Sequence, residues 1–233
     1  LFKKSLFINR TETLTHRLSF ERLSNFVKFP AYVKRNNIQY AGLEACWFTP
    51  DKSSLDKIIF YLPGGGYCVG SCNTHKGLIG RMARAAGHPI IAINYRKAPE
   101  NPYPAAIEDA VRVYKQLVED GYKNIILSGD SAGGGLALAT TMVLRDEGFK
   151  LPMALVLLSP WTDLTCSGDS VTRKKDRDAL ISPELLEVFA KKYAGKEDLK
   201  NPLISPLFGD FTNFPPTLIQ VGTEELLLDD ATR

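Results

Sequence analysis

A serine between glycines marks a place where the chain could carry out nucleophilic chemistry. Residues 129–134 read Gly-Asp-Ser-Ala-Gly-Gly, after an apolar run at 124–128 and before a helix-forming run at 136–144. The pattern Gly-x-Ser-x-Gly between a strand and a helix is typical of a serine nucleophile on a tight turn. Glycines relieve backbone clashes in such a turn, and the helix N-terminus favours developing negative charge. We therefore predict that Ser131 is a nucleophile rather than part of a turn without chemistry.

Acyl transfer also needs N–H donors directed at the oxyanion of the tetrahedral intermediate. The residue after the nucleophile, Ala132, is expected to give one donor, and a loop after an earlier strand gives the others. Residues 61–67 read Tyr-Leu-Pro-Gly-Gly-Gly-Tyr and precede Ser131 in the required order. Three glycines alone would indicate only a flexible loop. In combination with Ser131 they predict an oxyanion hole.

Apolar runs of strand length alternate with segments of helical periodicity along most of the chain. The predicted strands lie near 38–48, 57–62, 89–95, 124–128, 153–158 and 217–221, and the predicted helices near 75–86, 104–120, 131–147 and 183–194. This alternation predicts a mostly parallel central sheet with helices on both faces. We expect residues 1–35 to form N-terminal cap helices, residues 36–233 to form the main α/β domain, and residues 161–200 to form a cap insertion within it.

Further sequence blocks stand in a fixed order around the two glycine-rich segments. They are Gly64-Gly65-Gly66, Gly70-Ser71, Thr74-His75, residues 94–100, residues 102–106, Glu108-Asp109-Ala110, residues 159–164, and Ser205-Pro206-Leu207 through Pro215-Pro216. Together with residues 129–134, these blocks resemble the hormone-sensitive-lipase-like family of α/β-hydrolases, in its bacterial esterase branch. The resemblance implies an α/β-hydrolase fold with a small helical cap and a preference for short-chain acyl esters.

The resemblance also implies roles for individual residues. Gly65, Gly66 and Ala132 would supply the N–H groups of the oxyanion hole. The family's catalytic acid lies in an Asp-x-Leu-x-Asp segment after a late strand, and Glu225 fits the first position of that segment. Glu224 is the alternative, one residue earlier and pointing another way on an extended chain. A longer carboxylate such as Glu225 can still orient an imidazole.

Two departures from the family pattern affect the site. Pro63 stands where the family usually has histidine, which removes a side-chain hydrogen bond but none of the oxyanion donors. The family's catalytic histidine follows the acid by about 30 residues, whereas the given sequence ends at Arg233. We therefore expect a sequence truncated at its C-terminus, from a chain of roughly 300 residues. The strand at 217–221 would then lie near a sheet edge, with leucines 226–228 just beyond it.

None of the histidines in the given sequence is expected to be the catalytic base. His16 falls among the cap helices, His75 is expected to pack or hydrogen-bond near the oxyanion loop, and His88 is interpreted as a loop residue. Cys68, Cys72 and His75 mimic the spacing of a metal site, but a fourth ligand is missing. The sequence therefore predicts no metal and no other cofactor.

Composition excludes several functional classes. The net charge of +3 is too small to indicate a nucleic-acid surface. No apolar run approaches the roughly 18 residues that would span a bilayer, and four cysteines are too few for a disulfide scaffold, which favours a cytoplasmic protein. The expected partner is a small-molecule ester, with a homodimer allowed. The aromatic residues Phe26, Tyr67 and Trp161 could line an acyl pocket or belong to the core.

The sequence thus supports two functional hypotheses. The first is a carboxylesterase that forms an acyl-enzyme on Ser131, with amidase, deacetylase or lactonase activity allowed on the same machinery. The second is a catalytically dead member of the fold that binds a small ligand. The absence of a matching histidine favours the second hypothesis, whereas the intact serine turn and glycine-rich loop favour the first.

Overall fold

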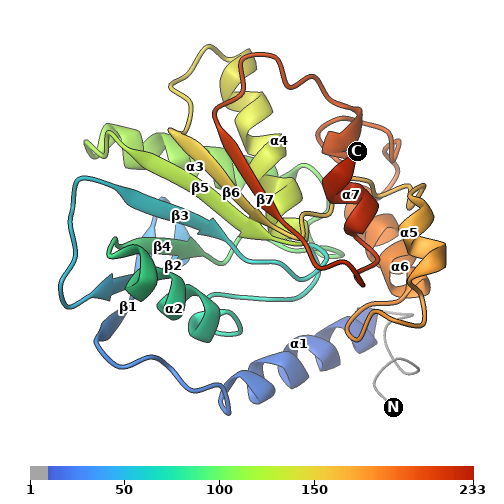
Figure 1. Cartoon of the computed structure of the whole chain (residues 1–233), viewed down its shortest axis with the longest axis horizontal. Helices are drawn as coiled ribbons and strands as arrows, with labels where there is room; N and C mark the ends of the chain where they lie inside the picture. Colours follow the sequence, from blue (N-terminus) through green and yellow to red (C-terminus); the bar gives the residue numbers. More distant parts are fainter. Residues whose placement is uncertain (1–9) are drawn as a thin grey trace.

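A seven-stranded sheet forms the centre of the computed structural model, which describes residues 10–233 (Figure 1). The strands are β1 (Val33–Tyr40), β2 (Leu43–Pro50), β3 (Ile58–Leu62), β4 (Ile90–Ile93), β5 (Ile125–Asp130), β6 (Ala154–Leu158) and β7 (Thr217–Gln220). Their order in the sheet is β1-β2-β4-β3-β5-β6-β7. The pairs β1–β2 and β2–β4 are antiparallel and all others are parallel, which confirms the prediction of a mostly parallel sheet.

Helices cover both faces of this sheet. They are α1 (Arg10–Ser24), α2 (Lys76–Ala86), α3 (Ala105–Glu119), α4 (Ala132–Asp146), α5 (Asp169–Arg173), α6 (Pro183–Ala194) and α7 (Leu228–Thr232), with a 3₁₀ turn at Pro206–Phe208. Figure 1 shows α2 on one face and α3 and α4 on the other. Within the described residues, no helix is long and apolar enough to cross a membrane.

The apolar run of β3 explains why the sheet is covered on both faces. Ile58, Phe60 and Leu62 belong to the core cluster on the side of α3 and α4. Ile59 and Tyr61 belong to a second cluster, on the side of α2. Successive side chains of a strand point to opposite faces, so a strand that is apolar at every position requires cover on each face.

Two of the predicted elements differ from those of the structure. The single strand expected at 38–48 is a hairpin of β1 and β2, because Ala41 and Gly42 form a two-residue turn with φ values of 48° and 79°. Both values are positive, as in the turns that join tight hairpins. Of the helices expected in 1–35, the structure contains α1, which ends at Ser24, and residues 1–9 lie outside the described part.

Strand β7 lies at the edge of the sheet as expected, but the leucines that follow it are not exposed there. β7 is the last strand of the described sheet, and Leu218 on it is 63% exposed. By contrast, Leu226 and Leu227 are buried, with 0% and 2% exposed, and do not extend an uncovered edge. The reason is that the chain turns back into α7 and is held there, since the Ser170 hydroxyl donates to the Leu226 carbonyl at 2.6 Å.

Helices α5, α6 and α7 lie together at the end of the sheet where β5 and β6 finish, and α1 runs toward them (Figure 1). Lys192 on α6 donates to the Thr13 hydroxyl on α1 at 2.7 Å. Arg17 on α1 donates to the carbonyl oxygens of Cys68 and Ala98, each at 2.6 Å. These contacts join α1 both to α6 and to the segment that follows the glycine-rich loop.

Candidate active site

Ser131 lies at the turn between β5 and α4 in a conformation that few non-glycine residues adopt. Its φ is 50° and its ψ is −123°. The turn is held by backbone hydrogen bonds, in which the Ser131 N–H donates to Leu158 and the Ser131 carbonyl accepts from Trp161, both at 2.9 Å. A strained turn of this kind projects a side chain from the end of a sheet. Ser131 is half-buried, so its side chain remains within reach of a substrate.

The glycines around Ser131 allow three segments to meet. A methyl group on Gly133 would overlap the carbonyl oxygen of Leu62, and one on Gly129 would overlap the carbonyl oxygen of Gly133. Leu62 is the last residue of β3 and pairs with Gly129 on β5. The two glycines therefore bring the N-terminus of α4 against the end of β3, where the glycine-rich loop begins.

The glycine-rich loop turns sharply beside Ser131. Gly65 and Gly66 have φ values of 123° and 58°, and the Gly65 carbonyl accepts from the N–H groups of Cys68 and Val69 at 3.0 and 2.9 Å. Within residues 10–233, the N–H groups of Gly65, Gly66 and Ala132 have no hydrogen-bond acceptor. Backbone donors without a partner suit a site that binds an oxyanion.

Helix α6 packs directly on this loop. The Tyr193 ring stacks on Tyr67 with ring centroids 3.6 Å apart, and a methyl group on Gly66 would overlap the ring of Phe189. Tyr67 and Trp161 are buried and their ring centroids are 6.2 Å apart, so both belong to the core. Phe26, the third aromatic residue considered from the sequence, is 88% exposed and lies just after α1.

Asp130 is a site residue that sequence reasoning missed, because it occupies a variable position of the serine motif. Its carboxylate accepts from the Gly64 N–H at 2.9 Å and from the Tyr61 hydroxyl at 2.6 Å, and it faces His75 Nε2 at 3.2 Å. Asp130 thus joins the serine turn to the glycine-rich loop and to the segment before α2. The pairing of His75 with an acidic neighbour of Ser131 was not predictable from their spacing in the chain.

Asp130 and His75 each shift the pKa of the other. Burial would raise the pKa of Asp130, but the neighbouring His75 and the hydrogen bonds from His75, Tyr61 and Gly64 lower it overall. Burial would lower the pKa of His75, but the charge of Asp130 and its hydrogen bond raise it overall. Each group therefore favours the charged form of the other, the ionised form of Asp130 and the protonated form of His75, beside the glycine-rich loop.

Replacing Asp130 with asparagine tests this arrangement. The amide can still accept from Gly64 but cannot balance the charge of His75, so we expect a loss of about 2 kcal/mol in stability and a fall in Tm of about 4–8 °C. A displaced loop should lower the rate of the ester hydrolysis expected from the sequence by about 10²-fold. Thermal unfolding and initial rates measure the two effects. Tyr61→Phe is the matched control, since it removes one hydrogen bond to Asp130 and keeps the ion pair, and an equal loss in both variants would contradict the role of the charge.

The two candidate acids lie in different environments. Glu224 is exposed and forms surface ion pairs with Lys174 at 3.2 Å and Arg177 at 2.9 Å. Glu225 is half-buried, and its Oε1 accepts from the Gly222 N–H at 2.8 Å, which holds the carboxylate over the turn that follows β7. The Ser159 N–H after β6 donates to the Gln220 carbonyl at the end of β7. Strand β6 lies between β5 and β7 in the sheet, so one strand separates this turn from the serine turn.

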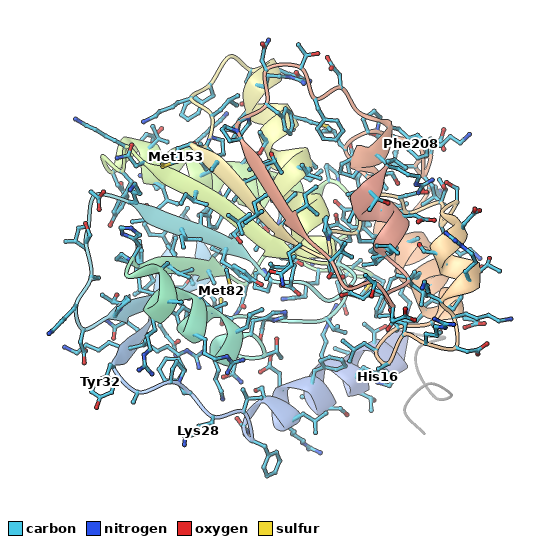
Figure 2. The ribbon with its side chains drawn as sticks, in the orientation of Figure 1. His16, Lys28, Tyr32, Met82, Met153 and Phe208 are labelled. Carbon is cyan, nitrogen blue, oxygen red and sulfur yellow. The ribbon has the colours of Figure 1, made fainter. Side chains whose placement is uncertain are left out.

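The remaining residues singled out from the sequence do not come together. His75 faces Asp130, as expected for a residue near the oxyanion loop, and His88 Nδ1 contacts the Ser54 carbonyl at 3.2 Å. His16 lies on α1 (Figure 2). Cys68 and Cys72 belong to different core clusters. Within the described chain, no group of three or more histidine, cysteine or acidic side chains could hold a metal ion.

Comparison with known proteins places the chain among hydrolases. Residues 59–233 match a family model described as the alpha/beta hydrolase fold. The chain is 46% identical over 187 residues to an acetyl-hydrolase of Streptomyces hygroscopicus, which covers 79% of this chain. It is 41% identical over 186 residues to an esterase of Acinetobacter venetianus, which covers 78% of this chain. This chain spans 62% and 61% of the lengths of these two relatives.

A solved structure extends the similarity to the whole described fold. An esterase from the bacterial hormone-sensitive lipase family superposes with a TM-score of 0.92 at 38% sequence identity, and the match covers 97% of this chain and 76% of the esterase.

Proposed function

Since this chain belongs to the α/β-hydrolase family, in its bacterial hormone-sensitive-lipase-like branch, we propose that the protein is a carboxylesterase that forms an acyl-enzyme on Ser131. The observation that carries the proposal is the turn at Ser131, with a φ of 50°, which the bond from the Gly64 N–H to Asp130 ties to the glycine-rich loop. Among the described residues, the N–H groups of Gly65, Gly66 and Ala132 have no acceptor, which supports their proposed role as oxyanion donors. A nucleophile and oxyanion donors at one end of a sheet are the two parts that acyl transfer requires.

The proposed mechanism has two half-reactions. The Ser131 oxygen attacks the ester carbonyl as a histidine base takes its proton, and the three N–H groups stabilise the oxyanion. The intermediate expels the alcohol, which receives the proton, and water then releases the acid by the reverse sequence. Glu225 is proposed to orient this histidine. His75 and His88 are engaged with Asp130 and Ser54, so neither is proposed as the base.

We also propose that the segments 1–35 and 161–200 act as a cap on this site, with 36–233 as the main domain. The stacking of Tyr193 on Tyr67 and the hydrogen bond between Lys192 and Thr13 support this division.

A cytoplasmic location agrees with four cysteines that are free thiols. A homodimer is a further proposal, which size-exclusion chromatography would test.

The substrates are proposed to be esters of short acyl chains. The Phe189 ring lies against Gly66, and Tyr193 stacks on Tyr67, so aromatic side chains of α6 border the proposed oxyanion loop, an arrangement that supports a preference for small acyl groups. We expect kcat/KM for p-nitrophenyl acetate and butyrate to exceed that for the decanoate by about tenfold or more. A series of p-nitrophenyl esters measures this ratio. A preference for decanoate would contradict the proposed acyl specificity but not the role of Ser131.

A further inference from the structure

Helix α5 and the loop after it hold the residue that follows the proposed catalytic acid. Leu226 comes directly after Glu225, and both of its backbone polar groups bind side chains from this part of the chain. The Leu226 N–H donates to Asp178 Oδ2 at 2.9 Å, and the Leu226 carbonyl accepts from the Ser170 hydroxyl at 2.6 Å. Both side chains are buried, so water does not compete for these bonds. A segment about 50 positions earlier in the sequence thus holds the peptide groups on either side of Leu226.

The turn that carries Glu225 has longer hydrogen bonds of its own. The Glu225 N–H donates to the Gly222 carbonyl at 3.2 Å, and the Glu225 carbonyl accepts from the Leu228 N–H at 3.3 Å. Hydrogen bonds of this length are weaker than those that Leu226 makes. Since Glu225 shares a peptide group with Leu226, the bond to Asp178 limits the direction in which the Glu225 side chain leaves the backbone.

The two side chains that hold Leu226 are themselves held in place. Asp178 Oδ1 accepts from the N–H groups of Leu180 and Ile181 at 2.8 and 3.0 Å. The Ser170 hydroxyl accepts from the Asp229 N–H at 3.1 Å, and the Ser170 N–H donates to Asp229 Oδ2 at 2.8 Å. Side chains fixed by further hydrogen bonds hold their partners within a narrow range of geometry. We call Ser170 and Asp178 together the Leu226 clamp.

We propose that Ser170 and Asp178 are positioning residues, which keep the Glu225 carboxylate where it orients the histidine base. The proposal rests on the proposed function, in which Glu225 is the acid. A displacement of about 1 Å in a catalytic arrangement is enough to lower a rate strongly. The alternative role of the clamp is to satisfy the buried backbone groups of Leu226 and nothing more. Loss of that role would lower stability without any effect on the histidine.

Each arm of the clamp can be removed separately. In Asp178→Asn, the amide oxygen can still accept from Leu180 and Ile181, and the NH₂ group then faces the Leu226 N–H, which it cannot bind. Ser170→Ala removes the bond to the Leu226 carbonyl. In the full-length protein, we expect each variant to lower kcat for p-nitrophenyl acetate by about 10–10²-fold. KM should stay within about twofold of the wild-type value, because the clamp does not bind substrate.

The pH dependence of kcat/KM in Ser170→Ala separates positioning from a structural role, since this variant changes no charge. The rate falls at low pH as the histidine base becomes protonated. A well-placed Glu225 carboxylate stabilises the protonated histidine and raises its pKa, so a displaced carboxylate lets that pKa fall. The acidic limb should therefore shift to lower pH by about 0.5 unit or more. The variant also keeps the charged groups around the acid turn, which are Glu224 with Lys174 and Arg177, and Asp229 with Arg173.

Ser182→Ala is the matched control for a loss of stability alone. Ser182 lies in the same part of the chain, and its hydroxyl accepts from the Leu185 N–H at 3.3 Å, which caps α6 rather than the acid turn. Removal of this cap should lower Tm by about 2–4 °C. We expect kcat within about twofold of the wild type and an acidic limb at the wild-type pH. A limb that shifts as far in Ser182→Ala as in Ser170→Ala would overturn the proposal.

A double variant tests whether the clamp acts through Glu225. When Ser170→Ala is added to Glu225→Gln, kcat should fall by no more than about threefold further, because the charge to be positioned is already gone. A further fall as large as that of Ser170→Ala alone would overturn the proposal. Wild-type kcat in Ser170→Ala or Asp178→Asn, or an unshifted limb in Ser170→Ala, would overturn it too. If Glu225→Gln is slow in that case, only the clamp is refuted, whereas wild-type kcat in Glu225→Gln would refute both the acid and the clamp.

Discussion

Replacing Ser131 with alanine is expected to lower kcat for p-nitrophenyl acetate by about 10⁴-fold or more. The reason is that no other group stands at the turn between β5 and α4 to form the acyl-enzyme, while the oxyanion donors still give a small residual rate. Alanine keeps the backbone of the turn, so the thermal unfolding of the variant should resemble that of the wild type. Initial rates with the full-length protein and thermal melts measure both quantities.

Ser128→Ala is the matched control for this experiment. Ser128 lies on β5, just before the serine turn, and its buried hydroxyl donates to the Val156 carbonyl at 2.7 Å. The change should cost about 1 kcal/mol in stability and leave kcat close to the wild-type value. Wild-type turnover by Ser131→Ala, or a comparable loss of kcat in Ser128→Ala, would contradict the assignment of the nucleophile.

Glu225→Gln is expected to have the second largest effect, a fall in kcat of about 10³–10⁴-fold. The amide oxygen can still accept from the Gly222 N–H, so the turn after β7 is retained. What the variant loses is the negative charge that we propose orients the histidine and stabilises its protonated form. Steady-state kinetics of the full-length variant measures the loss.

Glu224→Gln provides the comparison for the acid. Its carboxylate pairs with Lys174 and Arg177 on the surface. Exposed ion pairs contribute little to stability because solvent screens them, so this variant should keep kcat within about twofold of the wild type. The opposite ranking of the two glutamine variants would show that Glu224 is the acid.

The sequence predicts the elements of this fold well where glycines and apolar periodicity coincide. The helices at 75–86 and 183–194 and the strand at 57–62 match α2, α6 and β3 to within one residue. The tight turn around Ser131 was predictable because only glycine tolerates the close approach of Gly133 to Leu62. The hairpin at Ala41 and Gly42 was missed because one of its two turn residues is not a typical residue for positive φ.

Long-range contacts account for what the sequence could not predict. His75 and Asp130 are 55 positions apart, and their pairing depends on how the segment before α2 packs against β5. Each of these two residues has an ordinary explanation when read alone, and only the tertiary structure brings their charges together. The burial of Leu226 and Leu227 has the same origin, since both join the main core cluster, to which Val171 of α5 also belongs.

Labelling with an organophosphonate ester tests most directly whether Ser131 is the nucleophile. The reagent mimics the tetrahedral intermediate and stays bound to the serine that attacks it. Tryptic digestion should place a single adduct on residues 124–145, which contain both Ser128 and Ser131, and fragmentation should assign it to Ser131. Adduct formation and ester hydrolysis should disappear together in Ser131→Ala. An adduct on another residue, or ester hydrolysis by a protein that forms no adduct on Ser131, would contradict the account.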